Sequence, residues 1–298
     1  MAFSRSISGF QLAATRDASL FLSGPEALRQ QRGEQSPIHK FRRIRYPWQP
    51  MKLSLFSLLI SMASSLSAQG PLRFELKLVE KQAKECVAAF EYPEILSAKT
   101  SEAQARINAG ILRVLLRSAA WPARDSGFES LSAYADGFVK GCGTPQARPG
   151  NVRPYLHKRV TIYRYTPPVL SFKCDSDEDD GGAHPFGTTF FINFDGRTGQ
   201  LITLKDLVKD RSLPKLEALA ESRFRSDRNL SPNESLSAAY YTFPGDQFRL
   251  NENFGLGEEQ LTFFFNAYEI GPGALGSAKI EIRYPILRSI LKLDLSGN

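Results

Sequence analysis

The first regular pattern of the chain is an alternation of hydrophobic and polar residues that begins at Leu72. Every second residue from Leu72 to Leu78 is hydrophobic, and this alternation predicts a strand over 72–79 with one half-buried face. A second strand is predicted over 86–90. It should end near Pro93, because proline cannot donate to the hydrogen-bond ladder of a sheet.

Helical spacing of hydrophobic residues follows these two strands. Ser101 and Gln104 have the spacing of a capping box, and apolar residues then recur at helical spacing until Pro122, where the helix should stop. A second, shorter helix is predicted over 128–139, before Gly141.

Strand patterns dominate the second half of the chain. β-branched and aromatic residues predict strands over 160–165, 169–172, 188–194, 201–203, 248–250, 261–265 and 278–282. Helices are predicted over 204–208 and 214–225, with a final helical turn over 286–291. Because a few helices stand between blocks of hairpin-linked strands, the predicted fold class is α+β with a mostly antiparallel sheet.

The segment 51–68 is organised like a secretory signal peptide. Lys52 supplies positive charge, 53–66 is apolar, and Leu66-Ser67-Ala68 offers a cleavage site with small residues. The apolar stretch is shorter than the roughly 20 residues of a membrane span. We therefore expect a soluble protein in the periplasm or outside the cell, with a mature chain that begins near Gln69.

Residues 1–50 are polar and irregular. Either translation starts at Met51 and they are not made, or they form a short cytoplasmic segment before an uncleaved signal anchor. Only the second case predicts attachment to a membrane. Downstream, prolines and glycines over 144–154 predict a boundary between two modules, 69–155 and 156–298.

Composition and charge exclude some classes of protein. Hydrophobic residues make up 42% of the chain, enough for a core, so a wholly disordered or fibrous chain is excluded. The net charge is +7, but residues 1–68 carry nine Lys and Arg against three Asp and Glu. The rest of the chain is nearly neutral, and we expect no nucleic-acid partner.

The cysteines agree with export. Cys86, Cys142 and Cys174 all follow the apolar segment, and an oxidising compartment favours one disulfide among them. Three pairings are possible, and the spacing does not choose between them. No Cys-x-x-Cys pattern or nearby histidine completes a tetrahedral zinc site.

One stretch concentrates negative charge. Its five carboxylates within six residues are Asp175, Asp177, Glu178, Asp179 and Asp180. A calcium loop requires a glycine and a bidentate acid at the positions of Asp180 and Phe186. The stretch is therefore predicted to be a solvated hairpin loop rather than a calcium site.

The motif Gly181-Gly182-Ala183-His184-Pro185 follows at once. His184 has the chemistry of a ligand or general base, but His39 and His157 complete no metal or catalytic pattern with it. The simpler interpretation is that the glycines permit a positive φ at a strand entry while a buried imidazole bonds backbone groups. No nucleophile elbow, phosphate loop or dinucleotide motif is present. We expect no metal, no cofactor and no catalytic residue.

Several ordered motifs carry a family resemblance. They are Pro168-Val-Leu-Ser-Phe172, Gly181-Gly-Ala-His-Pro185, Asn193-Phe-Asp195-x-x-Thr198-Gly199, Leu204-Lys-Asp-Leu207 and Phe265-x-x-Tyr268-Glu-Ile270-x-Pro272. Residues 157–292 resemble the C-terminal domain family of the anti-sigma factor RsiV, a domain of unknown function of the DUF3298 type. Residues 72–155 resemble more weakly the companion N-terminal domain that also accompanies some peptidoglycan deacetylases such as PdaC. The resemblance implies an extracytoplasmic α+β module, which in RsiV binds lysozyme.

These observations lead to one main hypothesis. The chain is expected to be an exported, non-enzymatic binding module of the RsiV type, with lysozyme, another cell-wall hydrolase or a cell-wall glycan as its partner. The acidic stretch, Gly181, Gly182 and His184 are the candidate contacts. One alternative is an envelope enzyme that acts on peptidoglycan, or a deacetylase-associated protein. Another is a membrane-anchored extracytoplasmic sensor.

Overall fold

The computed structural model describes residues 72–83, 86–118, 122–142, 153–166, 168–180, 184–293 and 295. All of them belong to one compact unit that runs from Ser65 to Asn298. The segments 1–50 and 51–68, Gly181 and Gly182 lie outside the described residues. Within the described part of the chain, no helix is long and apolar enough to cross a membrane.

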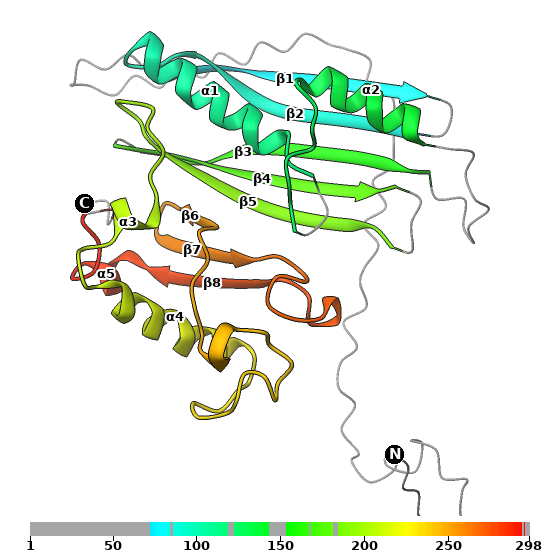
Figure 1. Cartoon of the computed structure of the whole chain (residues 1–298). Coiled ribbons are helices and arrows are strands. Elements are labelled where there is room, and N and C mark those ends of the chain that lie inside the picture. Colours follow the sequence, from blue (N-terminus) through cyan, green and yellow to red (C-terminus); the bar gives the residue numbers. More distant parts are fainter. Residues whose placement is uncertain are drawn as a thin grey trace, which may run out of the picture. The chain divides into compact units, whose positions relative to one another are not determined.

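Five strands form the larger sheet, in the order in which they follow one another along the chain. They are β1 (Arg73–Ala83), β2 (Cys86–Ser97), β3 (Tyr155–Thr166), β4 (Val169–Asp179) and β5 (Phe186–Asp195) (Figure 1). Three of the four neighbouring pairs are antiparallel, whereas β2 and β3 are parallel. A parallel pair needs a long crossover, and two helices stand between these strands.

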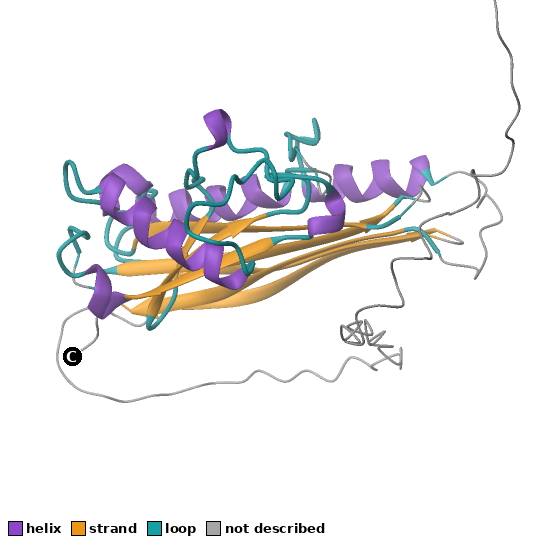
Figure 2. Ribbon diagram, turned by 90° about the horizontal axis from the view of Figure 1, so that it is seen from below, coloured by secondary structure: helices purple, strands orange, loops and turns teal. Residues whose placement is uncertain are grey.

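Helices α1 (Ser101–Leu115) and α2 (Leu131–Gly141) cover one face of this sheet, whereas the opposite face carries no described helix (Figure 2). Thr100 rather than Ser101 caps α1, since its hydroxyl accepts a hydrogen bond from the amide of Ala103 at 3.0 Å. The helix buries Ile107 and Ile111 completely, as the helical spacing predicted.

A smaller antiparallel sheet contains β6 (Phe254–Leu256), β7 (Gln260–Phe265) and β8 (Ala278–Arg283). The other elements of this part of the chain are α3 (Leu204–Leu207), α4 (Leu213–Asp227), α5 (Tyr284–Leu287) and two short 3-10 turns, Pro244–Asp246 and Gly273–Leu275. Together the two sheets and the helices confirm the α+β class.

Two predicted strands are wrong in this region. Residues 248–250 form no strand, because Phe248 is buried among the rings of Phe224, Phe243 and Phe265 without a ladder. Residues 201–203 contribute only a single bridge, from Leu201 to Phe194.

The prediction for β1 is right about the strand and wrong about its burial. Phe74, Leu76 and Leu78 alternate on one face as expected, but their exposed fractions are 45%, 74% and 60%. Their partners in β2 are Ile95, Pro93 and Glu91, whereas Val79, on the other face of β1, packs against the core. The hydrophobic alternation therefore marks an exposed apolar surface.

The structure settles the cysteine pairing. Cys86 and Cys142 form a disulfide with Cα atoms 6.4 Å apart, within the normal range for such bonds. It ties the start of β2 to the end of α2. Cys174 is a buried free thiol in β4.

A buried lysine joins β3 to the end of α1. The ammonium group of Lys158 donates to the carbonyl oxygens of Leu115, at 3.0 Å, and Arg117, and lies 5.0 Å from the ring centre of Tyr134. A cation is favoured at the carboxyl end of a helix, where carbonyl groups lack amide partners. Burial lowers the pKa of Lys158 from 10.5 to about 8.

Asparagine side chains join the two sheets. The amide N–H of Phe191 donates to the Asn253 side chain at 2.9 Å, and that of Thr189 donates to Asn266 at 2.7 Å. Asn253 also donates to the carbonyl oxygen of Thr189 at 2.8 Å. On the other side, Asn193 of β5 donates to the carbonyl oxygen of Phe254 at 2.7 Å. We call these bonds the asparagine seam. They give hydrogen-bond partners to N–H and C=O groups at the outer edge of β5, where no strand pairs with it.

We expect Lys158→Met to destabilise the protein, since two carbonyl oxygens at and just beyond the end of α1 lose their donor. The loss of unfolding free energy at pH 7 should be about 1–3 kcal/mol.

In the wild type, the folded state holds fewer protons at Lys158 than the unfolded state between pH 8 and 10.5. This group therefore makes the wild type more stable as the pH rises through that window. Urea unfolding of both proteins should show a difference that widens from pH 8 to 10.5, and Lys140→Met, an exposed position on α2, is the control. A constant difference would contradict the role given to Lys158.

We expect Asn253→Ala to lower the free energy of unfolding by about 1–3 kcal/mol, because the Phe191 N–H loses its acceptor in a buried position. Asn253→Asp keeps that acceptor but turns a carboxylate oxygen toward the Thr189 carbonyl. It should be at least as destabilising at neutral pH. Urea denaturation measures both, with exposed Asn233→Ala as the control. If Asn253→Asp matched the wild type, the donation to Thr189 would have no energetic role.

Candidate functional site

The acidic stretch is not a hairpin loop, contrary to the prediction. Asp175 to Asp179 belong to β4, which pairs with β3 on one side and β5 on the other. Successive side chains of a strand point to opposite faces, so the carboxylates are divided between them. Asp180 follows the strand and is exposed.

Contacts within the protein already engage several of these carboxylates. Asp175 accepts from Lys173 at 2.8 Å and from the hydroxyl of Thr189 at 2.7 Å, whereas Asp177 accepts from the Tyr155 hydroxyl at 3.2 Å. Burial raises the pKa of Asp177.

The two remaining strand carboxylates differ in their surroundings, because Asp179 lies on the same side of β4 as Asp177 and Glu178 on the other. Asp179 is buried, and Glu178, on the face opposite Asp177, lies close enough to Lys158 and Tyr134 to influence their pKa values. The five acids therefore do not form one continuous patch.

His184 is exposed rather than buried. Its ring is stacked against Tyr268, and its Nε2 lies 3.2 Å from the Tyr268 hydroxyl. Its Nδ1 lies 3.3 Å from the carbonyl oxygen of Pro185, the backbone contact that the prediction anticipated. Among the residues that the structure describes, no three His, Cys, Asp or Glu side chains gather as a metal site would require.

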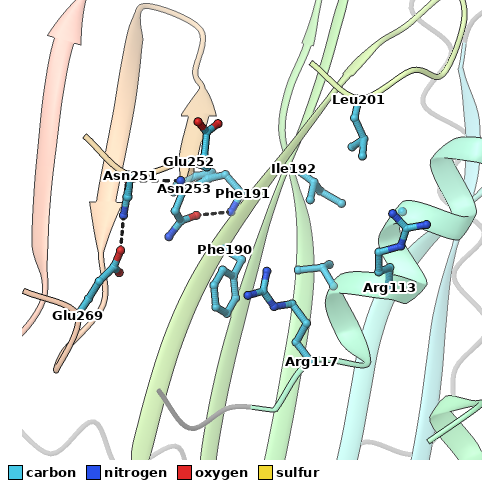
Figure 3. Close-up of a pocket in the computed structure, with 12 residues that line it drawn as sticks. Arg113, Arg117, Phe190, Phe191, Ile192, Leu201, Asn251, Glu252, Asn253 and Glu269 are labelled. Carbon is cyan, nitrogen blue, oxygen red and sulfur yellow. Dashed lines mark hydrogen bonds between the residues drawn. The ribbon is translucent and has the colours of Figure 1, made fainter. Parts of the chain in front are cut away.

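A cleft of about 280 Å³ lies beside the asparagine seam (Figure 3). Its walls come from α1, β5, the segment before β6 and the residues after β7. The lining residues are Gly110, Arg113, Val114, Arg117, Phe190, Phe191, Ile192, Leu201, Asn251, Glu252, Asn253 and Glu269.

Arg113 of α1 and Arg117, just after the helix, make one wall cationic. Arg117 lies over the ring of Phe190, 4.3 Å from its centre, and donates to the carbonyl oxygen of Ala123 at 3.2 Å. Burial lowers its pKa, but an arginine remains charged at neutral pH. Arg113 is exposed one turn earlier on the helix, and its guanidinium is the more accessible of the two.

A glycine allows this wall to approach the sheet. A Cβ atom at Gly110 would lie 2.5 Å from the ring of Phe194, which is itself buried. Any larger residue would push α1 away from β5. The width of the cleft therefore depends on this close contact.

Amide and carboxylate groups form the opposite wall. The Asn251 side chain donates to Glu269 at 2.7 Å, and the backbone N–H of Asn266 donates to the same carboxylate at 2.8 Å. Burial raises the pKa of Glu269 although these hydrogen bonds oppose the shift. Glu252 is exposed at the rim. The cleft thus combines cationic, amide and anionic groups around the Phe190 ring.

Sequence reasoning missed this cleft. Its residues come from segments that lie far apart in the sequence, and Asn251-Glu252-Asn253 matches no known motif. The only available signal was a cluster of polar residues immediately before a hydrophobic strand.

A curated relative shares part of this sequence. It is the peptidoglycan-N-acetylmuramic acid deacetylase PdaC of Bacillus subtilis, which is 24% identical over 142 residues. The match covers 47% of this chain and 30% of the deacetylase. The chain therefore spans less than a third of the length of that relative.

Two crystal structures share the fold. A member of the DUF3298 family from Bacteroides fragilis superposes with a TM-score of 0.59 and 19% identity, covering 76% of this chain and 95% of that one. A DUF3298 family protein from Pseudomonas aeruginosa gives a TM-score of 0.56 and 19% identity, covering 77% and 98%. The family model described as a protein of unknown function, DUF3298, matches residues 205–285. The expected resemblance is confirmed: residues 205–285 form a DUF3298 domain.

Proposed function

We propose that this chain is an exported, non-enzymatic module that binds a carboxylate-bearing cell-wall glycan in the cleft beside the asparagine seam. The observation that carries the proposal is the composition of the cleft walls. The guanidinium of Arg113 suits a carboxylate, because arginine presents paired N–H donors that match its two oxygens. Glu252, which is exposed at the rim, suits the hydroxyl groups of a sugar as a hydrogen-bond acceptor.

Two further observations support the envelope as the setting. A disulfide between Cys86 and Cys142 favours an oxidising compartment, and the curated relative acts, by its name, on N-acetylmuramic acid of peptidoglycan. N-acetylmuramic acid carries the carboxyl group through which peptides are attached, so both its free and peptide-bearing forms present acidic groups.

We expect Arg113→Ala to weaken binding to purified peptidoglycan about tenfold, the effect of losing one charge-assisted hydrogen bond. Because Arg113 is exposed, its replacement should leave the fold intact. Arg223→Ala, which removes an exposed arginine of α4, is the matched control and should bind like the wild type. Co-sedimentation with sacculi measures binding. An unchanged affinity of Arg113→Ala would contradict the proposal, and release of muropeptides by the wild type would favour the enzymatic alternative.

A second candidate partner is a cationic cell-wall hydrolase such as lysozyme. The observation that favours it is a group of acids around His157 on the face of the large sheet opposite α1 and α2: Glu80, Glu91 and Asp177 all raise its pKa. Arg159 opposes them and forms an ion pair with Glu91 at 2.8 Å, so the excess negative charge comes from Glu80 and Asp177. Burial nevertheless has the larger effect and lowers that pKa. An acidic face of this kind would attract a basic partner and accelerate their encounter.

We expect lysozyme binding, if it uses this face, to weaken strongly between low and physiological salt, because added ions screen exposed charges. Glu80→Gln with Asp177→Asn should reduce the association rate, and Glu252→Gln at the cleft is the matched control. Titration followed by surface plasmon resonance separates the rates. Undetectable binding at micromolar concentrations would remove lysozyme as a partner.

A further inference from the structure

The outer edge of β1 carries an apolar surface that the fold does not use. β1 is the first strand of the five-stranded sheet, and within the described residues only β2 pairs with it. Phe74, Leu76 and Leu78 form a continuous exposed stripe along this edge. We call these three residues the β1 stripe.

Proteins normally protect such an edge. Short strands, prolines, bulges or inward-pointing charges prevent a second chain from pairing with the free N–H and C=O groups. β1 extends over 11 residues and contains no proline. Its one irregularity lies at its beginning, between Arg73 and Phe74. Glu75 and Lys77 are charges on its inward face, so the edge can accept only a strand that places opposite charges against them.

The sequence of β1 is complementary to itself in one antiparallel register. When two copies pair about a two-fold axis at Leu76, each Phe74 lies opposite Leu78 of the other copy, and the two Leu76 residues face each other. On the opposite face, each Glu75 lies opposite Lys77. Apolar and opposite-charge pairs of this kind stabilise antiparallel strands.

The neighbouring registers are unfavourable. A two-fold axis at Lys77 places the two lysines opposite each other and Phe74 opposite Glu80. An axis at Glu75 places the two glutamates opposite each other. Like charges directly across a strand pair are destabilising, so the charges of β1 disfavour both neighbouring registers. An axis at Phe74 would centre the pairing on the irregularity between Arg73 and Phe74.

We propose that two copies of this chain pair through β1, antiparallel and centred on Leu76, so that their five-stranded sheets become one continuous sheet. A two-fold interface uses the same surface of both copies, which the self-complementary register supplies. β5 lies at the other edge of each sheet, so both asparagine seams and both clefts remain outside the interface. The pairing is independent of the proposed function.

The first test is the molar mass of the purified protein in solution, measured by light scattering after size exclusion over a range of concentrations. The wild type should be a dimer that dissociates on dilution. Leu76→Lys places two charges at the two-fold axis and should be a monomer. Ile286→Lys changes another exposed apolar residue, in α5, and should remain a dimer.

The second test uses charge pairing to verify the register. Glu75→Lys leaves only lysines at 75 and 77, and Lys77→Glu leaves only glutamates, so each variant alone should be a monomer. An equimolar mixture should form a heterodimer, because every lysine then lies opposite a glutamate.

Three outcomes would overturn the proposal. They are a wild type that is monomeric at every accessible concentration, a dimer that Leu76→Lys leaves intact, and charge variants that stay monomeric when mixed. A Leu76→Lys variant with unchanged circular dichroism and melting temperature would show that the fold is retained, as the exposure of this side chain leads us to expect.

Discussion

The asparagine seam determines how the rest of the molecule is arranged. β5 is the last strand of its sheet, and its buried N–H and C=O groups need partners. Asn253 and Asn266 supply them with side-chain amides, which have both a donor and an acceptor and so imitate the backbone of a further strand. The smaller sheet is thereby fixed beside the larger one without a ladder between them.

The cleft follows from this arrangement. Because the amides before β6 and after β7 reach the edge of β5, they also bring Asn251 and Glu269 opposite the arginines at the end of α1. Gly110 completes the approach from the other side. The polar groups of the cleft are therefore concentrated between the two sheets, whereas the β1 stripe lies at the far edge of the larger sheet.

Most helices and strands could be predicted from the sequence when their hydrophobic residues follow one regular spacing. α1 and α4 were recognisable because their buried residues recur at helical spacing, and β1 because its apolar residues alternate. Charge concealed the end of β4, since carboxylates are uncommon in strands. Burial was predicted wrongly for β1, because alternation alone does not say which face is covered. The cysteine pairing and the cleft depend on residues far apart in the chain, and no local pattern encodes such proximity.

Amide hydrogen exchange at β5 tests this account most directly. If the asparagine side chains hold the edge of β5, the N–H groups of Thr189 and Phe191 open only when the two sheets separate. They should then exchange as slowly as the amides of the central strand β4, such as that of Phe172. Exchange as fast as that of an open edge strand would show that the seam does not persist in solution, and the arrangement that forms the cleft would lose its basis.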